Sequence, residues 1–487
     1  MRITKITLLF IILLSMAVSP LQRRFHLFRE APLHGYFIPV PMPELKFFTW
    51  GRWFGSVFQD EMTTRLNENI GLRNPLIRIR NQYDWSLFGL THAQGFLEGK
   101  DRYFFEEDYI HEYSGRYFVG TNVIERKLSR LKNVMDSLAV YHIPLILVFE
   151  PGKASFYPEY IPDRFSPAKR TISNYDYFSK RAEELGLTVL DLNRYFLQMK
   201  DTSRYPLFPR YGMHWSMYGA HLAAGKLSGF IGKVTAKPMP GFKSCELQPT
   251  DKSPGTDYDI GDMMNLVWRL PSTPGVNPVV PFASIPDGTL PALVVADSYY
   301  LNLVETYSKK MFGKSDFWYY NSSVYPHQND YPSVKIDKSG LREKLKQYKV
   351  VLLMVSEINL HCCFWNFADE AYRAFHPTMK FSQLDNIENA IWVDREWFRF
   401  MVGRAKAQRL PLDRMVRENA EYTFSSGYKD SPGKTYWDTV EYISLNIKNN
   451  AEWYAQVKKT AHDEHRSLDS VILLNAIYSY EQSKNKH

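Results

Sequence analysis

The stretch Leu293-Val294-Val295-Ala296-Asp297-Ser298-Tyr299-Tyr300 decides the fold of this chain. It begins as an unbroken run of apolar and β-branched residues, which is typical of a strand buried on both faces of a parallel sheet. The carboxyl ends of such strands line the ligand crevice of open α/β sheets, so the Ser298 hydroxyl is predicted to face a substrate. The other interpretation is that Asp297 and Ser298 only cap a helix that begins near Tyr300, because both residue types are favoured N-caps.

A second stretch, residues 211–220 (YGMHWSMYGA), supplies a partner for this serine. A serine hydroxyl is a weak nucleophile until an adjacent base takes its proton, and histidine suits this task at neutral pH. His214 is the best candidate among the 13 histidines of the chain. The two stretches together predict a nucleophile, Ser298, with His214 as its general base.

Strands alternate with helices on both sides of these stretches. Apolar residues at helical spacing predict helices over 122–140, 175–185 and 219–231, and apolar runs predict strands over 144–149, 188–192 and 350–355. This alternation predicts an α/β fold with three layers and a mostly parallel sheet. Upstream, two short helices divided by Gly71 are expected over 59–88, and a hairpin over 95–110.

The last part of the chain, residues 366–487, has few glycines and periodic apolar positions, so it is predicted to be helical. It contains a two-copy repeat at a fixed offset, in which Glu396-Trp397 matches Glu452-Trp453. Equal spacing predicts that each copy is a helical hairpin with its tryptophan largely buried. The predicted organisation is therefore a signal peptide or membrane anchor (1–24), a connector with helices and a hairpin (25–110), the α/β domain (111–365) and the helical region (366–487).

Composition and charge exclude several classes of protein. With 45% hydrophobic and 15% aromatic residues, a sizeable core is available, and the net charge of +8 is modest for 487 residues. The chain has no block of like charges that would indicate nucleic-acid binding. Its three cysteines, Cys245, Cys362 and Cys363, have no metal-ligand spacing, and no metal or organic cofactor is indicated.

The amino-terminal residues have the layout of an export signal. Arg2 and Lys5 precede an apolar run over residues 6–18, and Arg23 and Arg24 follow it. Extended to Leu21, the run approaches the roughly 17 residues that a membrane span requires. We expect an exported protein on the periplasmic side of a bacterial inner membrane, either anchored there by this segment or released after cleavage.

The His-Trp pair followed by Ser-x-x-Gly-Ala, upstream of a strand that ends in Asp-Ser-Tyr, resembles the SGNH-hydrolase-like domain of the alginate O-acetyltransferase family. Residues 50–59, 71–74 and 99–105 and the Pro-Gly-Lys of 151–153 add to the resemblance, which spans roughly residues 45–365. The resemblance implies a periplasmic polysaccharide O-acetyltransferase. It also implies a polysaccharide substrate and a membrane-bound O-acyltransferase partner that delivers the acetyl group.

The chain departs from the family pattern at the residue that orients the histidine. Related transferases carry Asp-x-His-Trp, and this chain has Gly212 at the aspartate position. Asp259 and Asp262, with their neighbour Asp257, lie in the intervening segment and could replace the missing carboxylate, or they could be solvated loop residues. Loss of a triad aspartate that nothing replaces costs on the order of ten-thousandfold in rate. A second departure is Ile358, which stands where relatives have arginine.

These residues lead to two hypotheses. In the first, the protein is an O-acetyltransferase or acetylesterase in which Ser298 is transiently acetylated and its backbone N–H contributes to the oxyanion hole. The aromatic run Trp318-Tyr319-Tyr320-Asn321 would then bind the glycan, unless it is a half-buried strand. In the second, the protein is a catalytically inactive carbohydrate-binding or scaffold protein, and Gly212 is the main support for that alternative.

Overall fold

The computed structural model describes residues 6–7, 17–35, 49–165, 170–242, 245–271, 273–280, 290–325, 334–379, 382–428 and 435–484. Most of the apolar run predicted as a signal peptide or membrane anchor (1–24) lies outside these residues. No helix in the described ranges combines the length and the apolar character that a membrane span needs.

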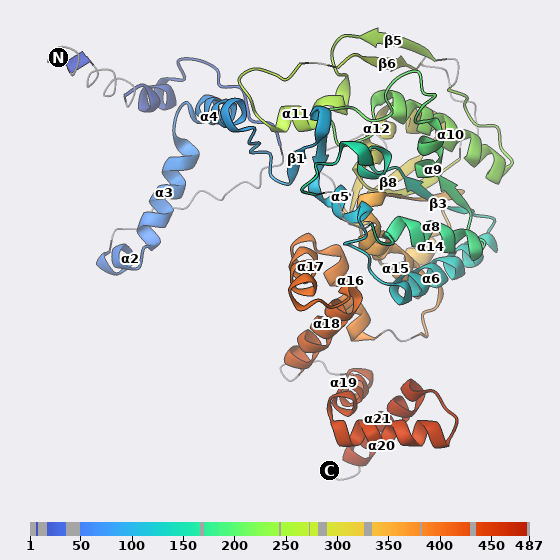
Figure 1. Cartoon of the computed structure of the whole chain (residues 1–487). Coiled ribbons are helices and arrows are strands. Elements are labelled where there is room, and N and C mark those ends of the chain that lie inside the picture. The colour runs from blue at the N-terminus through green and yellow to red at the C-terminus, as the bar shows by residue number, and fades with distance from the viewer. Residues whose placement is uncertain are drawn as a thin grey trace.

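A seven-stranded sheet forms the centre of the molecule, in the order β10-β9-β8-β7-β11-β3-β4 (Figure 1). Its five parallel strands are β8 (Ser315–Tyr319), β7 (Ala292–Ala296), β11 (Val350–Ser356), β3 (Leu145–Glu150) and β4 (Val189–Asp191). Two short antiparallel strands, β9 (Ser323–Tyr325) and β10 (Val334–Lys335), extend the β8 edge. The predicted mostly parallel sheet is confirmed.

Both faces of this sheet are covered, so the fold has three layers. Along β7, Leu293 and Val295 pack into the core on one face and Val294 and Ala296 into the core on the other. The first core includes α6 (Thr121–Ala139), α8 (Asn174–Glu184) and α15 (Phe367–Phe375), and the second includes α10 (Met217–Thr235) and α12 (Leu301–Leu303). An unbroken apolar strand needs such double cover, which is why this pattern marks a central parallel strand.

The shorter elements connect and border these layers. They are the helices α5 (Glu107–Tyr113), α7 (Lys153–Phe156), α9 (Leu192–Met199), α11 (Asp259–Met263), α13 (Lys309–Met311) and α14 (Leu341–Leu345), and the strand pair β5 (Glu246–Thr250) and β6 (Gly275–Val279). The chain before α5 contains α2 (Trp50–Phe54), α3 (Val57–Asn69), α4 (Arg73–Phe88) and the hairpin of β1 (Phe96–Glu98) with β2 (Phe104–Glu106). The two helices divided by Gly71 and the predicted hairpin are therefore present.

The region after residue 366 is helical, as predicted, but its helices pack in two ways. The helices α16 (Gln383–Val393), α17 (Arg395–Gln408) and α18 (Leu412–Tyr428) share the core of the α/β sheet. The helices α19 (Tyr436–Asn449), α20 (Ala451–Asp463) and α21 (Leu468–Lys484) share a second core, although Leu445 of α19 packs into the first, and Figure 1 shows them as a separate lobe. In packing, the tail therefore divides between α18 and α19.

The two copies of the repeat are the helical hairpins α17–α18 and α20–α21. Each begins with the same cap, because Asp394 accepts a hydrogen bond from Trp397 N–H and Asn450 accepts one from Trp453 N–H. The prediction that both indoles are largely buried was too strong, since each is only half-buried. Each tryptophan lies on the first turn of its helix, at the rim of its core, and the Trp397 indole donates to Asn419 at 2.9 Å.

Candidate active site

Ser298 lies where the sequence predicts it, directly after β7 and in the 3₁₀ turn Ser298–Tyr300. The residue before it, Asp297, is buried and caps this turn, since its carboxylate accepts the Tyr299 N–H at 3.0 Å. The same carboxylate accepts the Ser356 N–H at 2.9 Å, which ties the ends of β7 and β11 together. The capping interpretation therefore holds for Asp297, whereas the half-buried Ser298 side chain has another partner.

That partner is His214, whose Nε2 atom is 2.9 Å from Ser298 Oγ although 84 residues separate the two. The histidine lies in the segment between α9 and α10 and is nearly buried. The next residues fix this segment: Trp215 is buried against Phe196, and Ser216 caps α10 by accepting the Gly219 N–H. The packing of Trp215 and the cap at Ser216 together fix the backbone that follows His214, and so they set the position of its imidazole.

Asp259, the first residue of α11, supplies the third member of the constellation. One carboxylate oxygen is 2.8 Å from His214 Nδ1. The other accepts the backbone N–H groups of Met213, at 2.9 Å, and Ile260, at 2.7 Å. With both oxygens held, the carboxylate favours the imidazole tautomer that carries its proton on Nδ1 and presents a lone pair to Ser298.

Gly212 is crowded in a way that explains the missing aspartate at that position. A Cβ atom on residue 212 would lie 2.6 Å from the Thr256 carbonyl oxygen and 2.7 Å from Pro209 Cγ. The chain that leads into α11 therefore occupies the space that a side chain at 212 would need. The same segment ends at Asp259, whose carboxylate contacts His214.

The other two candidate carboxylates have different surroundings. Asp262 lies at the surface and forms an ion pair with Arg269 at 2.9 Å. Asp257 is buried and accepts the Met217 N–H at 2.9 Å, and its burial raises its pKa to about 7. Of the carboxylates proposed from the sequence, only Asp259 has a described hydrogen bond to His214.

Lys153 supports the loop that carries His214, a contact that the sequence did not indicate. Its ammonium group is fully buried and donates to the carbonyl oxygens of Gly212, at 2.7 Å, and Arg210, at 3.2 Å. Burial lowers the pKa of Lys153 to about 7, against the opposing effect of the carboxylates of Asp259 and Asp257. The sequence signal for this lysine was the Pro-Gly-Lys of 151–153, which contributed only to the family resemblance.

Tyr320 is the residue of the aromatic run that lies near the serine, because the Ser298 hydroxyl lowers the pKa of its phenol against the larger effect of burial. Its backbone has a left-handed conformation, with φ of 48°, and its N–H donates to the Ala296 carbonyl at 2.9 Å. Such a conformation is uncommon for a bulky residue and occurs often at functional sites. Burial raises the pKa of Tyr320 well above 10, so the phenol keeps its proton.

The rest of the aromatic run does not form the expected glycan platform. Trp318 is buried in the core on one face of the sheet, and Asn321 is buried with its amide donating to Trp365 O and Glu370, both at 2.8 Å. Tyr319 is half-buried. The alternative of a half-buried strand describes Trp318 and Tyr319 better, because both belong to β8, which pairs with β7.

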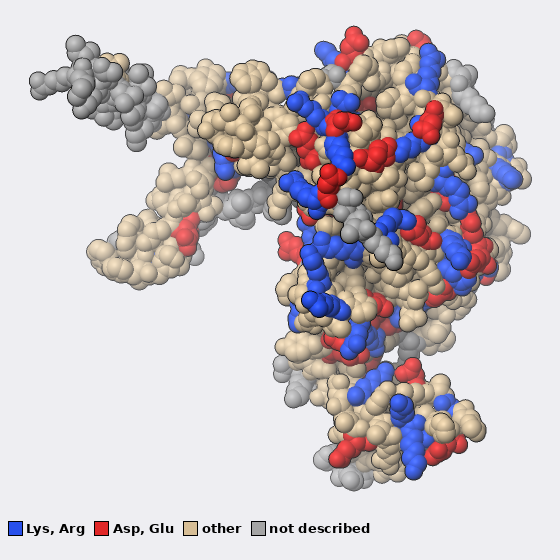
Figure 2. Space-filling model, in the orientation of Figure 1, with Lys and Arg blue, Asp and Glu red and all other residues tan. Residues whose placement is uncertain are grey.

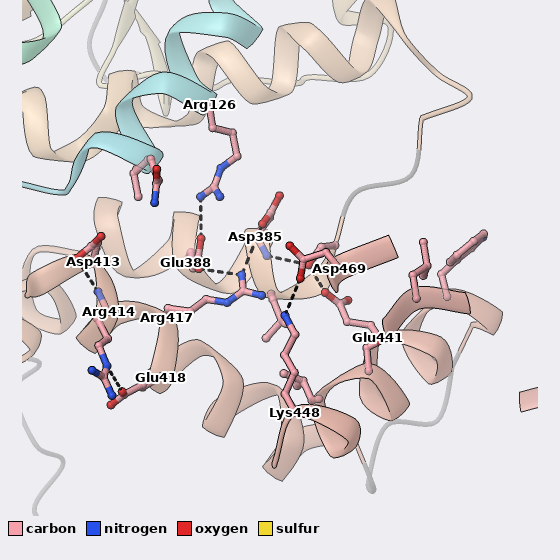
Figure 3. A pocket seen from close by; sticks show the side chains of 18 of the residues that line it. Arg126, Asp385, Glu388, Asp413, Arg414, Arg417, Glu418, Glu441, Lys448 and Asp469 are labelled. Carbon is pink, nitrogen blue, oxygen red and sulfur yellow. Dashed lines mark hydrogen bonds and ion pairs between the residues drawn. The ribbon is translucent and has the colours of Figure 1, made fainter. Parts of the chain in front are cut away.

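A cavity of about 1040 Å³ lies away from these residues, between the start of α6 and the helices α16, α18, α19 and α21. Figure 3 shows that its charged side chains point toward one another. Arg126 and Arg417 both bind Glu388, each at 2.9 Å, and Lys448 binds Asp469 at 3.4 Å. The residues that line this pocket come from both parts of the helical tail.

In the described part of the chain, no three His, Cys, Asp or Glu side chains are grouped so that they could hold a metal ion.

Comparison with known proteins agrees with this architecture. Residues 96–284 match the family model described as the SGNH hydrolase-like domain of acetyltransferase AlgX. This part of the chain is similar to the SGNH hydrolase-like domain of that acetyltransferase. The matched residues include His214 and Asp259 and end before Ser298.

Individual relatives resemble the chain over part of their length. The probable alginate O-acetylase AlgJ of Azotobacter vinelandii is 26% identical over 184 residues, which is 38% of this chain and 44% of that protein. Its Pseudomonas putida counterpart is 26% identical over 150 residues, or 31% of this chain and 37% of that protein. The chain thus spans less than half of these curated relatives. The solved O-acetyltransferase domain of Pseudomonas putida AlgJ is 19% identical, with a TM-score of 0.36, covering 55% of this chain and 92% of that one.

The second departure from the family pattern lies beside this site. Ile358, at the arginine position, packs into the core that contains α10. The preceding Glu357 is buried and accepts hydrogen bonds from Ser155 Oγ and, at 3.2 Å, from Asn193 Nδ2. Its burial raises its pKa to about 7. This end of β11 therefore presents an apolar side chain and a carboxyl group that holds its proton more strongly than usual.

Proposed function

We propose that this protein is an exported O-acetyltransferase or acetylesterase that moves acetyl groups onto or off a cell-surface polysaccharide. The observation that carries the proposal is the continuous chain of hydrogen bonds from Ser298 through His214 to Asp259, at 2.9 and 2.8 Å. Nucleophile, base and orienting carboxylate are the three roles that Ser-His-Asp chemistry requires. The resemblance to proteins named as alginate O-acetylases supports acetyl as the transferred group.

In the first half of the reaction, Ser298 Oγ attacks the carbonyl carbon of an acetyl ester while His214 Nε2 takes the hydroxyl proton. Asp259 stabilises the imidazolium that forms, because its negatively charged carboxylate accepts a hydrogen bond from Nδ1–H. The tetrahedral intermediate collapses when the bond to the donor oxygen breaks, and His214 returns its proton to that oxygen. The product is an acetyl ester on Ser298.

The negative charge on the carbonyl oxygen needs preorganised donors during this step. The Ser298 backbone N–H is one donor, as proposed from the sequence. We assign the Tyr320 phenol as a second donor, since it keeps its proton and lies near Ser298. The Ser298 N–H and the Tyr320 phenol are thus the two donors that we assign to the oxyanion.

In the second half of the reaction, His214 removes a proton from an incoming hydroxyl, which attacks the acetyl-serine. A sugar hydroxyl gives transfer and water gives hydrolysis, and in both cases the acetyl–serine bond breaks and His214 returns the proton to Ser298 Oγ. The acceptor is a polysaccharide. The acetyl donor comes from a membrane-bound O-acyltransferase, because acetyl-CoA is cytoplasmic and the protein acts on the periplasmic side of the inner membrane.

The competing hypothesis, an inactive carbohydrate-binding or scaffold protein, rested on Gly212. The carboxylate that Gly212 lacks is present at Asp259, in contact with the same histidine nitrogen that an orienting aspartate contacts. No observation on the described residues favours the inactive protein over the enzyme.

Acetate release from an activated acetyl ester by the purified full chain tests the proposal. We expect turnover by the native protein and a single added acetyl group on the peptide that contains Ser298 when the reaction is quenched early. Ser298→Ala should abolish both with the fold intact, and Ser322→Ala, at an exposed serine in the turn between β8 and β9, should change neither. A native protein that neither releases acetate nor becomes acetylated would contradict the enzyme and favour the scaffold.

A further inference from the structure

The helices before the hairpin, which we call the N-terminal arm (residues 49–90), have almost no core of their own. Neither α2 nor α3 contains a buried residue, and Asn81 is the only buried residue of α4. Figure 1 shows α2 and α3 standing away from the α/β body. Helices in proteins are stabilised mostly by packing of an apolar face, so an arm of this kind requires a surface to cover it.

One face of α4 is already used for contact with the body. Asn81 donates to the Met264 carbonyl at 2.9 Å, and the Trp85 ring packs against Phe104 with centroids 5.7 Å apart. These contacts fix how the helix is rotated. The residues on the opposite side of α4 must therefore point away from the domain that carries the triad.

That opposite side is an apolar stripe. Leu76, Ile79, Tyr83 and Leu87 follow one another at spacings of three, four and four residues, which places them on one face of a helix. All four are at least half exposed, from 50% for Leu76 to 61% for Leu87. Contiguous exposed apolar residues of this kind indicate an interaction surface.

The stripe is part of a larger apolar surface on the arm. Further along the arm, Phe54 is 80% exposed and Leu66 and Phe88 are each 62% exposed. Figure 2 shows the projecting part of the molecule as mostly uncharged, whereas blue and red residues alternate over the visible face of the body. The charged groups of the arm include Arg80, next to the stripe, whose side chain is 73% exposed and lies 3.7 Å from the Asp84 carboxylate.

The chain itself indicates what covers this surface. Residues 17–25 are helical and are fastened to the junction of α3 and α4, where Ser19 Oγ donates to Gly71 O at 2.8 Å and Arg23 donates to Asn69 at 2.6 Å. The sequence directly before this helix is the apolar run of residues 6–18, flanked by basic residues, which is the layout of a segment that enters a membrane. The arm is therefore attached within a few residues of that segment.

We propose that α4, with α3, lies on a lipid surface and inserts the stripe Leu76-Ile79-Tyr83-Leu87 at the boundary between headgroups and acyl chains. Aliphatic and aromatic side chains flanked by arginine are the composition of interfacial helices, because arginine reaches the phosphates while the apolar groups enter the lipid. The contact gives the SGNH hydrolase-like domain a second attachment to the membrane, in addition to the one predicted for residues 1–24. It does not depend on the chemistry at Ser298.

Fluorescence quenching of a single label, by a lipid-bound quencher or by an aqueous one, tests this contact. The full chain carries Cys245→Ser, which leaves Cys362 and Cys363, both buried, as its native thiols. A fluorescent label is attached at Leu87→Cys on the stripe or, as the matched control, at Phe400→Cys on α17, which is 58% exposed. The protein is reconstituted in vesicles of phosphatidylcholine and phosphatidylglycerol, with nitroxide-bearing lipid or aqueous iodide as the quencher.

We expect the label at position 87 to lose most of its fluorescence to the nitroxide lipid and to resist iodide, and the label at 400 to behave in the opposite way. Adding Leu76→Asp and Ile79→Asp should restore iodide quenching at position 87. Quenching of position 87 by iodide alone would show that the arm is in water and would overturn the proposal. Protection from both quenchers would also overturn it, since protein would then cover the stripe, and the oligomeric state would tell whether a second copy does so.

Discussion

Asp259 gives His214 the carboxylate that position 212 has no room to hold. The Asp259–His214 contact of 2.8 Å joins residues 45 positions apart, and the segment that ends at Asp259 passes 2.6 Å from where a Cβ on Gly212 would lie. The crowding at Gly212 and the Asp259–His214 contact have the same cause. The segment that leaves no room for a side chain at position 212 also places the Asp259 carboxylate beside His214. The N–H groups of Met213 and Ile260 donate to the other carboxylate oxygen of Asp259 and hold it in the position that the proposed triad needs.

Asp259→Asn should lower the turnover of an acetyl ester by roughly 10³- to 10⁴-fold, because an amide no longer favours the correct imidazole tautomer or stabilises the imidazolium. The thermal midpoint should change little, since the side chain keeps its size. Asp262→Asn is the matched control, as it lies on the same helix with its carboxylate paired to Arg269 at the surface, and it should keep full activity. Equal losses in the two variants would remove Asp259 from the proposed triad.

Gly212→Asp restores the residue type found in relatives and should nevertheless damage this protein. Its Cβ would meet the Thr256 carbonyl oxygen at 2.6 Å, and backbone cannot move aside cheaply, so we expect a loss of about 1–3 kcal/mol in the free energy of unfolding and no gain in activity. Gly225→Ala on α10 is the control, with open space around its Cβ, and should be neutral or stabilising. Higher activity in Gly212→Asp would mean that Asp259 is an inferior substitute.

Glu357→Gln should flatten the dependence of stability on pH. Burial raises the folded-state pKa of Glu357 to about 7, so its contribution to the free energy of unfolding is complete below the unfolded pKa near 4.5 and is lost as the pH rises through 7. That loss corresponds to about 3 kcal/mol for this group. Asp257, whose pKa is raised to about 7 by burial, acts in the same direction, so the slope should decrease without vanishing.

Urea unfolding at several pH values between 4.5 and 8 measures this slope. Glu343→Gln, at an exposed glutamate on α14, should leave it as in the native protein. An unchanged slope in Glu357→Gln would show that this carboxyl group ionises normally in the folded state.

Trp397→Ala should cost about 2 kcal/mol in the free energy of unfolding, less than the removal of a fully buried tryptophan, because the indole is half-buried but loses its hydrogen bond to Asn419. Tyr422→Ala, on the facing helix of the same hairpin and 72% exposed, is the control and should stay within about 0.5 kcal/mol of the native protein. Equal effects in a denaturant titration would show that the hairpin does not pack through Trp397.

Several parts of this molecule follow from local sequence. The apolar run 293–296 required cover on both faces and therefore marked a central parallel strand, and the periodic apolar positions of 122–140 marked the helix that covers one of those faces. Ser298 was recognisable because it follows a parallel strand, at the end where ligands bind in α/β folds. His214 was recognisable because a nucleophilic serine needs a basic side chain beside it. Hydrophobicity and its periodicity are properties of the local sequence, so they can be recognised before the tertiary structure is known.

The choice of Asp259 among three aspartates, the crowding of Gly212 and the placement of Tyr320 against Ser298 were decided only by the tertiary structure. Trp318, predicted to offer its ring to a glycan, is buried because β8 pairs with β7 and places that side chain in the core. Contacts of this kind join segments tens of residues apart, and their geometry depends on loop conformations that many sequences can adopt. Residue types alone therefore indicated the chemistry that we propose, and the packing of one loop against another determined which carboxylate contacts His214.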